Sequence, residues 1–366
     1  MHLQKCTDTA RSCIWYFEVG MAIQDWKNKL PVNKRGSLLK KPDRSLRRPV
    51  LLAFAFAVLL ALGLSWFWSQ EPDLMTVANT SDSPVVGALT TITLVNVGET
   101  LLNKPGGYLS NDIFLPSLWL DNIPQWEYGV IIQIRDLSKA LREAFSRSQS
   151  QSKEDKDLSL AEPRLNFDHA NWIMPRTEAE YSKGLEYLRS YHTRLHDADQ
   201  QDAQFFARAD NLNYWLGTVQ SRLGSLSQRL GASVGQKRIN TDLASDAQTE
   251  TEATQSSASP DEFEIKTSWF EIDDVFYEAR GTTWALVHFL KAAEVDFEDV
   301  LLKKNAQISL RQIIRELEAT QTPLFSPMIL NGSGFGILPN HSLTLASYIS
   351  RANAAIIDLR ELLDRG

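Results

Sequence analysis

Two histidines set one helical turn apart are the candidate metal ligands of this sequence. His192 and His196 lie near the end of a predicted helix, and Asp197 and Asp199 come closely after them. This spacing can place two imidazoles on one helix face, as ligands of a metal ion. The pattern lacks the glutamate of a zinc-protease motif, and histidines at a helix end often only face solvent. We therefore predict no bound metal and no cofactor, with this pair as the place where a metal would bind.

Three acidic residues are the candidate catalytic groups. Asp273, Asp274 and Glu278 occupy the first two turns of a helix that is predicted to begin at Ile272. General acid–base catalysis would need one of these carboxyls to be buried with a raised pKa. Acidic residues also favour helix N-termini because of the helix dipole, and Glu278 and Arg280 could pair with other buried charges. An envelope hydrolase is therefore the alternative hypothesis, and a protein without enzymatic activity is the main one.

The remaining motifs indicate structure rather than catalysis. The glycine-rich loop at 331–336 reads NGSGFG, but it lacks the lysine and the following serine or threonine of a phosphate-binding loop. We expect a tight turn there, since glycine adopts backbone angles that other residues avoid. His288 and His341 are isolated, and we expect both to be structural. The sequence offers no recognisable serine–histidine–aspartate arrangement.

The chain is organised around an uncharged stretch of twenty residues at 49–68, which reads PVLLAFAFAVLLALGLSWFW. A helix of this length rises about 30 Å, the thickness of the hydrocarbon core of a bilayer. A buried core helix is the alternative, but such helices rarely run this far without a polar face. We predict one transmembrane helix over 49–68, in contact with the lipid bilayer.

The span divides the charge of the chain. Residues 1–48 carry eleven Lys or Arg and four Asp or Glu, whereas the remainder carries 27 and 41. Because positive charge is retained in the cytoplasm, we predict a cytoplasmic N-terminus and, in a Gram-negative cell, a periplasmic body anchored in the inner membrane. The basic tail is expected to contact anionic lipid headgroups, not nucleic acid. Trp66 and Trp68 would belong to an aromatic belt at the far interface.

We predict that the span is an uncleaved signal-anchor. The residues Ala-Leu-Gly at 61–63 loosely match a cleavage site, so a cleaved signal peptide is the alternative. The basic region is long for a signal peptide, and the hydrophobic stretch continues for five residues beyond Gly63. Cys6 and Cys13 both precede the span, so the predicted exported body can form no disulfide. Residues 1–20 differ in character from the basic region after them, and Met21 is an alternative translation start.

The body consists of helices joined by polar segments. We expect a linker at 69–84, a helical half at 85–239, a disordered acidic linker at 240–262 and a second helical half at 263–366. Apolar residues recur at steps of three and four, which is the helical period. The predicted helices cover 85–102, 124–145, 177–195, 209–230, 272–295, 309–320 and 342–363.

Two of these helices carry predicted N-terminal caps. Thr177 and Glu180 have the spacing of a capping box, and Ser309 precedes an apolar periodic stretch. The most regular seam lies at 209–230, where Leu216, Val219 and Leu223 belong to a heptad-like pattern. We expect a long antiparallel helix pair within one domain, and an intermolecular coiled coil that forms a homo-oligomer is the alternative.

Five strings carry a resemblance to a known family: LLNKPGGYLSND (101–112), FSRSQSQSKEDKDL (145–158), SRLGSLSQRL (221–230), IDDVFYEARGTTWAL (272–286) and NGSGFGILPNHSL (331–343). On these strings the chain resembles a family of uncharacterised Gram-negative inner-membrane proteins of unknown function. The likeness covers nearly everything from the span to the C-terminus. It implies one N-terminal span and a mostly helical extracytoplasmic domain, and it supplies no active-site residues.

Together these observations predict a mainly α-helical protein with one transmembrane helix and a multi-helix periplasmic domain of long antiparallel amphipathic helices. Its predicted role is that of a non-enzymatic scaffold or adaptor, with other envelope proteins or a second copy as partners. The basis is the length of the amphipathic helices and the lack of a recognisable catalytic motif.

Overall fold

The computed structural model confirms the mainly α-helical fold. It describes residues 44–77, 85–113, 115, 117–147, 153–197, 202–239, 262–324, 326, 328–333 and 337–365. The predictions for Cys6, Cys13 and Met21, for most of the basic tail and for 240–261 lie outside these residues. Met1–Leu59 and Leu60–Gly366 form two separate compact units.

The long apolar helix is α2 (Arg44–Trp68), in agreement with the predicted span. Its segment Arg48–Trp68 is long and apolar enough to cross a membrane, and none of it is buried. A solvent-exposed helix of this kind has no polar face with which to meet water. Length and composition therefore make α2 a candidate membrane span.

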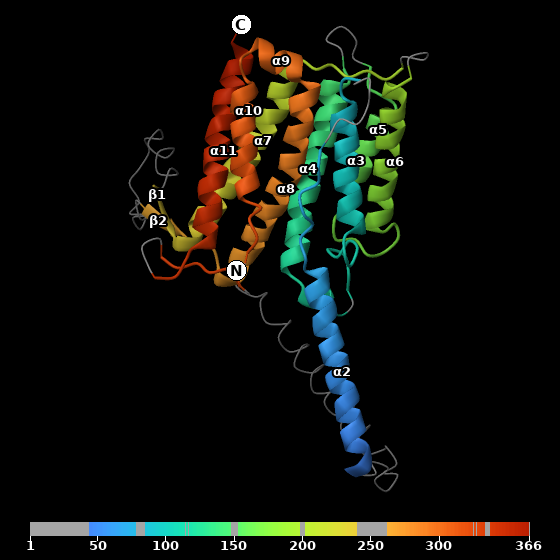
Figure 1. Cartoon of the computed structure of the whole chain (residues 1–366), viewed down its shortest axis with the longest axis vertical. Coiled ribbons are helices and arrows are strands. Elements are labelled where there is room, and N and C mark those ends of the chain that lie inside the picture. Colours follow the sequence, from blue (N-terminus) through green and yellow to red (C-terminus); the bar gives the residue numbers. More distant parts are fainter. Residues whose placement is uncertain are drawn as a thin grey trace, which may run out of the picture. The chain divides into compact units, whose positions relative to one another are not determined.

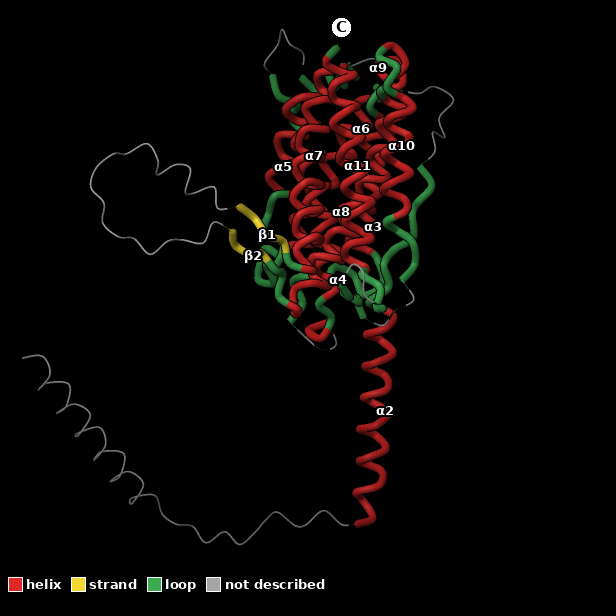
Figure 2. The backbone as a smooth tube through the Cα atoms, turned by 90° about the vertical axis from the view of Figure 1, so that its left-hand side faces the viewer, coloured by secondary structure: helices red, strands yellow, loops and turns green. Residues whose placement is uncertain are grey.

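The second unit is a bundle of helices, shown in Figure 1 and, turned by 90°, in Figure 2. The bundle includes the short α9 (Glu298–Lys303). Two short strands, β1 (Gln236–Ile239) and β2 (Glu262–Ile265), pair antiparallel and lie low on the left side of the bundle in Figure 1. The long helices are α3 (Ala88–Asn103), α4 (Asn122–Ala140), α6 (Thr177–Leu195), α7 (Ala209–Gly231), α8 (Ile272–Asp296), α10 (Gln307–Ala319) and α11 (His341–Asp364), with the shorter α5 (Leu158–Leu165) and a π-helical turn, Leu141–Phe145, after α4.

Helix α8 is the centre of the bundle, because it is buried on nearly all sides. Its closest neighbour is α4, which runs in the same direction: Trp126 packs on Trp284 near one end and Phe145 packs on Phe297 at the other. Glycines allow this approach. A Cβ on Gly281 would stand 2.0 Å from the carbonyl oxygen of Trp126, a separation that no packed atom pair tolerates.

The Gly281→Ala variant should therefore lose about 1–3 kcal/mol of folding free energy, because the backbones of α4 and α8 must separate. Gly224→Ala on α7 is the matched control. A Cβ there meets nothing closer than 3.5 Å, so the better helix propensity of alanine should make the change neutral or stabilising. Urea denaturation followed by circular dichroism compares the two. Equal effects would contradict the close approach.

The predicted seam on α7 is confirmed as an intramolecular contact. Its leucines and Val219 are buried, and α7 packs along α11. The two helices are antiparallel, since Arg360 on α11 donates to Asn213 at 2.6 Å, whereas Asn353 lies beside Gly224. The long antiparallel pair inside one domain is thus the observed arrangement.

The connections between helices gather at two ends of the bundle. Helices α4, α6, α8 and α11 begin, and α3, α7 and α10 end, at the end where Trp68 packs against Gly106. We call this the anchor end and the other the distal end. Two hydrogen bonds agree with these directions. Thr320, just after α10, bonds to Thr283 on α8, and Asn111, in the loop after α3, bonds to Glu178 in the first turn of α6.

Both predicted N-caps were wrong. Helix α6 does begin at Thr177, but its hydroxyl donates to the carbonyls of Asp168 (2.8 Å) and Asn171 (3.0 Å) in the preceding loop. Helix α10 begins two residues before Ser309, after Ala306. Neither hydroxyl caps its helix, because that of Thr177 is bonded to the preceding loop and Ser309 lies inside the first turn of α10.

Candidate functional site

The histidine pair lies in the last turn of α6 and just after it. The rings of His192 and His196 are 4.6 Å apart between centroids, and His196 Nδ1 bonds to the carbonyl oxygen of His192 at 2.9 Å. Burial, and then the neighbouring His196, lower the pKa of His192. Within the described part of the chain, no group of three or more His, Cys, Asp or Glu side chains could hold a metal ion.

The three predicted acidic residues do not share one site. Asp273 lines a hollow of about 130 Å³ with Trp269 and Met328. Asp274 and Glu278 line a different one of about 380 Å³ at the anchor end. Burial, and next the charge of Asp273, raise the pKa of Asp274 to about 6.

Glu278 is held in an ion pair. Its two carboxylate oxygens accept from the guanidinium of Arg229 on α7 at 2.6 and 2.7 Å. This bidentate ion pair occupies both carboxylate oxygens of Glu278. Glu278 is therefore not available as the second free carboxyl beside Asp274, and the other carboxyl that lines the same hollow is that of Glu271.

A cleft of about 400 Å³ lies between α4, α7 and α8, next to this ion pair. Gln133 lines it and is only 1% exposed, and neither polar atom of its amide has a hydrogen-bond partner in the described residues. Both guanidiniums at the cleft are neutralised, Arg229 by Glu278 and Arg222 by Asp136 at 2.8 Å. The cleft therefore offers a buried amide and nearby hydroxyls, which suit a water molecule or another small polar group.

The segment that comes after α2 is bonded directly to the central helix. We call residues 69–77 the connecting segment. Its Glu71 carboxylate accepts from Arg280 on α8 at 2.6 to 3.0 Å. The same guanidinium donates to the carbonyls of Thr320 and Thr322, at 2.8 and 3.0 Å, beyond the end of α10. Arg280 is buried, so this one side chain joins three parts of the bundle.

Two further side chains on the same face of α8 continue the contact. Trp284 Nε1 donates to the carbonyl of Asp73 at 3.3 Å, and the backbone N–H of Met75 donates to His288 Nε2 at 2.9 Å. His288 Nδ1 lies 2.7 Å from the carbonyl of Trp284, so Nδ1 carries the proton and the ring is neutral. Burial lowers the pKa of His288 to about 4. The expectation that His288 is structural agrees with these contacts.

A second buried charge fixes the turn after α3. Glu127 and Lys104 are both fully buried side chains, 2.6 Å apart. The Glu127 carboxylate also accepts the N–H groups of Leu109 and Ser110, and Lys104 donates to the carbonyl of Gly107 at 2.7 Å. Burial raises the pKa of Glu127, and Lys104 opposes that rise. This pair holds the Lys-Pro-Gly-Gly turn against α4.

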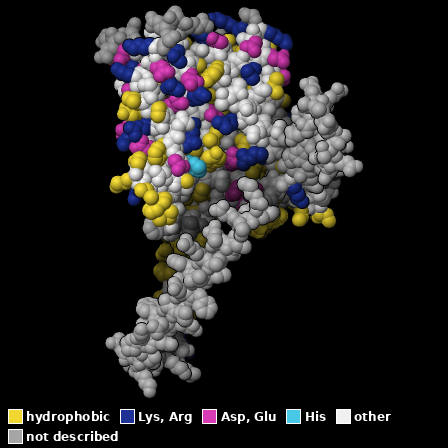
Figure 3. All heavy atoms as spheres, turned by 180° about the vertical axis from the view of Figure 1, so that it is seen from behind, with side chains coloured by type: hydrophobic (Ala, Val, Ile, Leu, Met, Phe, Trp, Pro, Cys, Tyr) yellow, Lys and Arg dark blue, Asp and Glu magenta, His cyan; other side chains and the backbone are white. Residues whose placement is uncertain are grey.

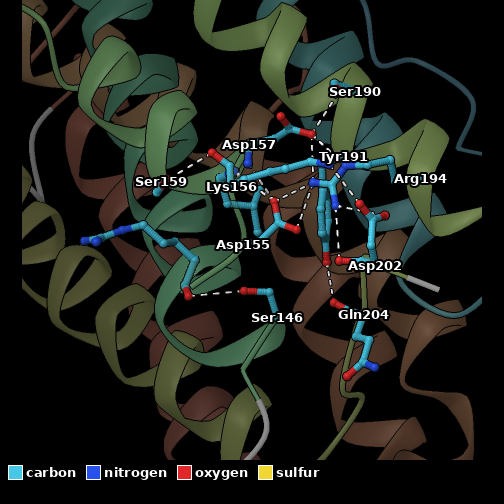
Figure 4. A network of polar contacts seen from close by, with 12 residues as sticks. Ser146, Asp155, Lys156, Asp157, Ser159, Ser190, Tyr191, Arg194, Asp202 and Gln204 are labelled. Atoms are coloured by element: carbon cyan, nitrogen blue, oxygen red, sulfur yellow. Dashed lines mark hydrogen bonds and ion pairs between the residues drawn. The ribbon is translucent and has the colours of Figure 1, made fainter. Parts of the chain in front are cut away.

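An arginine-centred network closes the distal end (Figure 4). Arg194 on α6 donates to Asp155 at 2.7 and 2.8 Å and to Asp157 at 2.8 Å, and it also pairs with Asp202. Tyr191 donates to the carbonyl of Gln204 at 2.7 Å beside it. The network joins two loops to one helix, so its role is to hold the distal loops in place.

The sequence analysis expected Arg280 to pair with a buried charge, but it did not identify its partner Glu71, and it missed the buried Glu127. Glu71 and Arg280 are 209 residues apart, and no spacing rule links such positions. Glu127 lies on the buried face of α4, next to Trp126 and one turn from Val130. A charged residue among such apolar neighbours was the one feature of the sequence that could have indicated a buried ion pair. A search for charges inside otherwise apolar helix faces would have found Glu127 as well as Arg280.

Comparison with known proteins gives one match. The model of a family described as "Uncharacterized protein conserved in bacteria (DUF2333)" matches residues 42–366. No curated protein and no solved structure matches the chain. The matched range includes α2, the connecting segment and the whole bundle.

Proposed function

The chain belongs to DUF2333, a family of uncharacterised proteins conserved in bacteria, and on this premise we propose that it is a single-pass inner-membrane protein that acts as a non-enzymatic scaffold of the cell envelope. Helix α2 is the anchor, and the bundle is the part that meets other envelope components. The N-terminus faces the cytoplasm and the bundle faces the periplasm.

The bonding of the connecting segment to α8 carries this proposal. An enzyme that is merely tethered needs only a flexible linker, because its chemistry is independent of where the anchor attaches. Here the chain leaves α2 and is bound at once by Arg280, Trp284 and His288 of the central helix. Such a connection suits a protein whose task is to hold a body at the membrane surface.

The charge distribution supports the orientation. Lysines and arginines are concentrated before the span, and the residues after it carry more acids than bases. Retention of positive charge on the cytoplasmic side would leave the bundle outside. At the distal end, Leu302 and Ile308 expose 53% and 81% of their surface, which offers apolar contact points for a partner protein.

Cysteine labelling of the full chain tests the topology. In a background without Cys6 and Cys13, Ile308→Cys should react with a membrane-impermeant maleimide in intact spheroplasts, because Ile308 is exposed on the bundle. A cysteine at Ser37, before the span, is the matched control and should react only after lysis. The reverse pattern would contradict the proposed orientation.

Site-specific photo-cross-linking tests the scaffold role. A photoreactive amino acid at Leu302 or Ile308 should give the same envelope-protein adduct in repeated preparations of native membranes, whereas one at exposed Glu186 on α6 should not. If none of these positions gives a reproducible adduct, the bundle has no stable partner at its distal end and the scaffold proposal fails.

A further inference from the structure

Exposed aromatic side chains gather at one end of the bundle. Among the described residues of the second unit, each strongly exposed Trp or Phe lies at the anchor end: Trp119, Trp172, Trp269 and Phe270 in loops of the bundle, and Trp66 and Phe67 in α2. Phe270 is 85% exposed. Large aromatic side chains are usually buried, so several exposed together on separate loops mark an interaction surface.

Aliphatic side chains on the same loops enlarge this surface. Met174 lies two residues after Trp172 and is 90% exposed, and Ile337 lies in the loop before α11 and is fully exposed. The exposed apolar residues of the distal end, such as Leu302 and Ile308, include no tryptophan or phenylalanine in the described residues. In the view of Figure 3, the larger groups of hydrophobic side chains are on the lower part of the bundle, and charged side chains are most frequent on the upper part.

The aromatic loops lie at the level where α2 joins the bundle. Trp66 lines a hollow of about 610 Å³ together with Asn122 at the start of α4 and with Leu324 and Ser326 after α10. Trp68 packs against Gly106, in the turn after α3. If α2 leaves the bilayer at Trp66 and Trp68, these loops stand next to the lipid headgroups.

We propose that Trp119, Trp172, Met174, Trp269, Phe270 and Ile337 form a collar that inserts into the interfacial layer of the bilayer that α2 crosses. This inference rests on the proposed anchoring. Tryptophan and phenylalanine lower their free energy at a membrane interface, and tryptophan concentrates there because one edge of its ring is polar. Four separate loops supply the collar, so the contact would not depend on any single segment.

The charges near the collar decide which lipid it meets. Asp112, Asp121, Asp273 and Asp274 are on the same loops and helix starts, against Arg176 and Lys266. An acidic surface is not attracted to anionic headgroups, so apolar insertion must drive the contact. The collar should therefore bind zwitterionic lipid as well as anionic lipid, and it should stay bound in about 1 M salt, where charge interactions are screened.

Depth-dependent quenching in the full chain tests the collar. In the background without Cys6 and Cys13, single cysteines at Phe270 or Ile337 carry an environment-sensitive fluorophore, and the chain is reconstituted in phosphatidylcholine vesicles with a nitroxide lipid. Leu59→Cys in the span is the positive control, and Ile308→Cys at the distal end is the negative control. All four positions are exposed, so labelling should leave the helix content seen by circular dichroism unchanged.

We expect a nitroxide near the headgroups to quench the Phe270 and Ile337 probes, and a nitroxide deep in the acyl chains to quench the Leu59 probe, in low and high salt, while the Ile308 probe keeps its emission with both. Quenching at Leu59 together with unquenched probes at Phe270 and Ile337 would overturn the collar and leave the anchor intact. An unquenched probe at Leu59 would instead overturn the proposed anchoring, and the collar with it.

Discussion

Replacing Glu127 by alanine is expected to cost about 3–5 kcal/mol of folding free energy, because it leaves the Lys104 ammonium buried without a counter-charge. Both side chains are inaccessible to solvent. The loss also removes the acceptor of the Leu109 and Ser110 N–H groups. Urea denaturation of the full chain in detergent, followed by circular dichroism, measures the change in midpoint.

Two variants show whether the buried charge is the cause. Glu186→Ala removes an exposed glutamate from α6 and should change the stability by less than about 0.5 kcal/mol. A double variant, Lys104→Met with Glu127→Leu, should recover much of the loss, because two apolar side chains of similar size can replace a buried ion pair. A double variant as unstable as Glu127→Ala would mean that the backbone N–H bonds, not the unpaired lysine, carry the effect.

The sequence predicted the long helices because each has a regular apolar period. Helix α8 was expected at 272–295 and is observed at Ile272–Asp296, and α11 was expected at 342–363 and is observed at His341–Asp364. The short α5 was missed. It has eight residues and an internal proline, Pro163, which is too little periodicity to separate a helix from a loop.

The caps failed for a different reason. A capping box is a local pattern, and the hydroxyl of Thr177 had the right position for one. In the folded chain that hydroxyl bonds to two carbonyls of the loop before it. The capping residues in the structure are different ones: the side chain of Asp121 accepts from the N–H of Asn122 at the start of α4, and that of Asn340 accepts from the N–H of Leu343 at the start of α11. Local patterns name the residue types that can cap, but the path of the loop before the helix decides which of them does.

The polar contacts between distant segments could not be derived from one sequence. Asp296, at the end of α8, accepts from the N–H of Thr90 at 2.6 Å and so supports the start of α3, which has no side-chain cap of its own. Arg280 and His288 likewise bond to a segment that precedes α3. Each of these partners is set by the packing of α8 among its neighbours, and only the folded chain brings them together.

Acid should destabilise the protein through His288. Its pKa is lowered from 6.5 to about 4 by burial, so the folded protein keeps the ring neutral while the unfolded chain takes up a proton. Above pH 6.5 both states are neutral and the ring has no pH-dependent effect. Between pH 6.5 and 4 the unfolded state binds more protons, so about 3 kcal/mol of stability should be lost as the pH falls.

Other titratable groups change the stability in the opposite direction as the pH falls. A variant that lacks the histidine is therefore needed to measure the effect of His288 alone. Burial raises the pKa of Glu127 and Asp296, and a raised carboxyl pKa makes the folded state gain stability as the pH falls. His288→Gln keeps an acceptor for the Met75 N–H and does not titrate. As the pH falls from 7 to 4.5, the unfolding free energy of the native chain should therefore decrease relative to that of His288→Gln.

Hydrogen exchange in the connecting segment should show the effect of His288 protonation locally. Opening of the segment exposes the His288 ring, which then takes up a proton below pH 6.5 and cannot accept from the Met75 N–H. The protection factor at residues 71–77, which corrects for slower intrinsic exchange in acid, should therefore fall below pH 6.5 in the native chain and stay higher in His288→Gln. His196→Gln, at the exposed end of α6, serves as the control and should behave like the native chain. If stability and exchange depend on pH in the same way in the native chain and in His288→Gln, the contact of His288 with the connecting segment is not the acid-sensitive one.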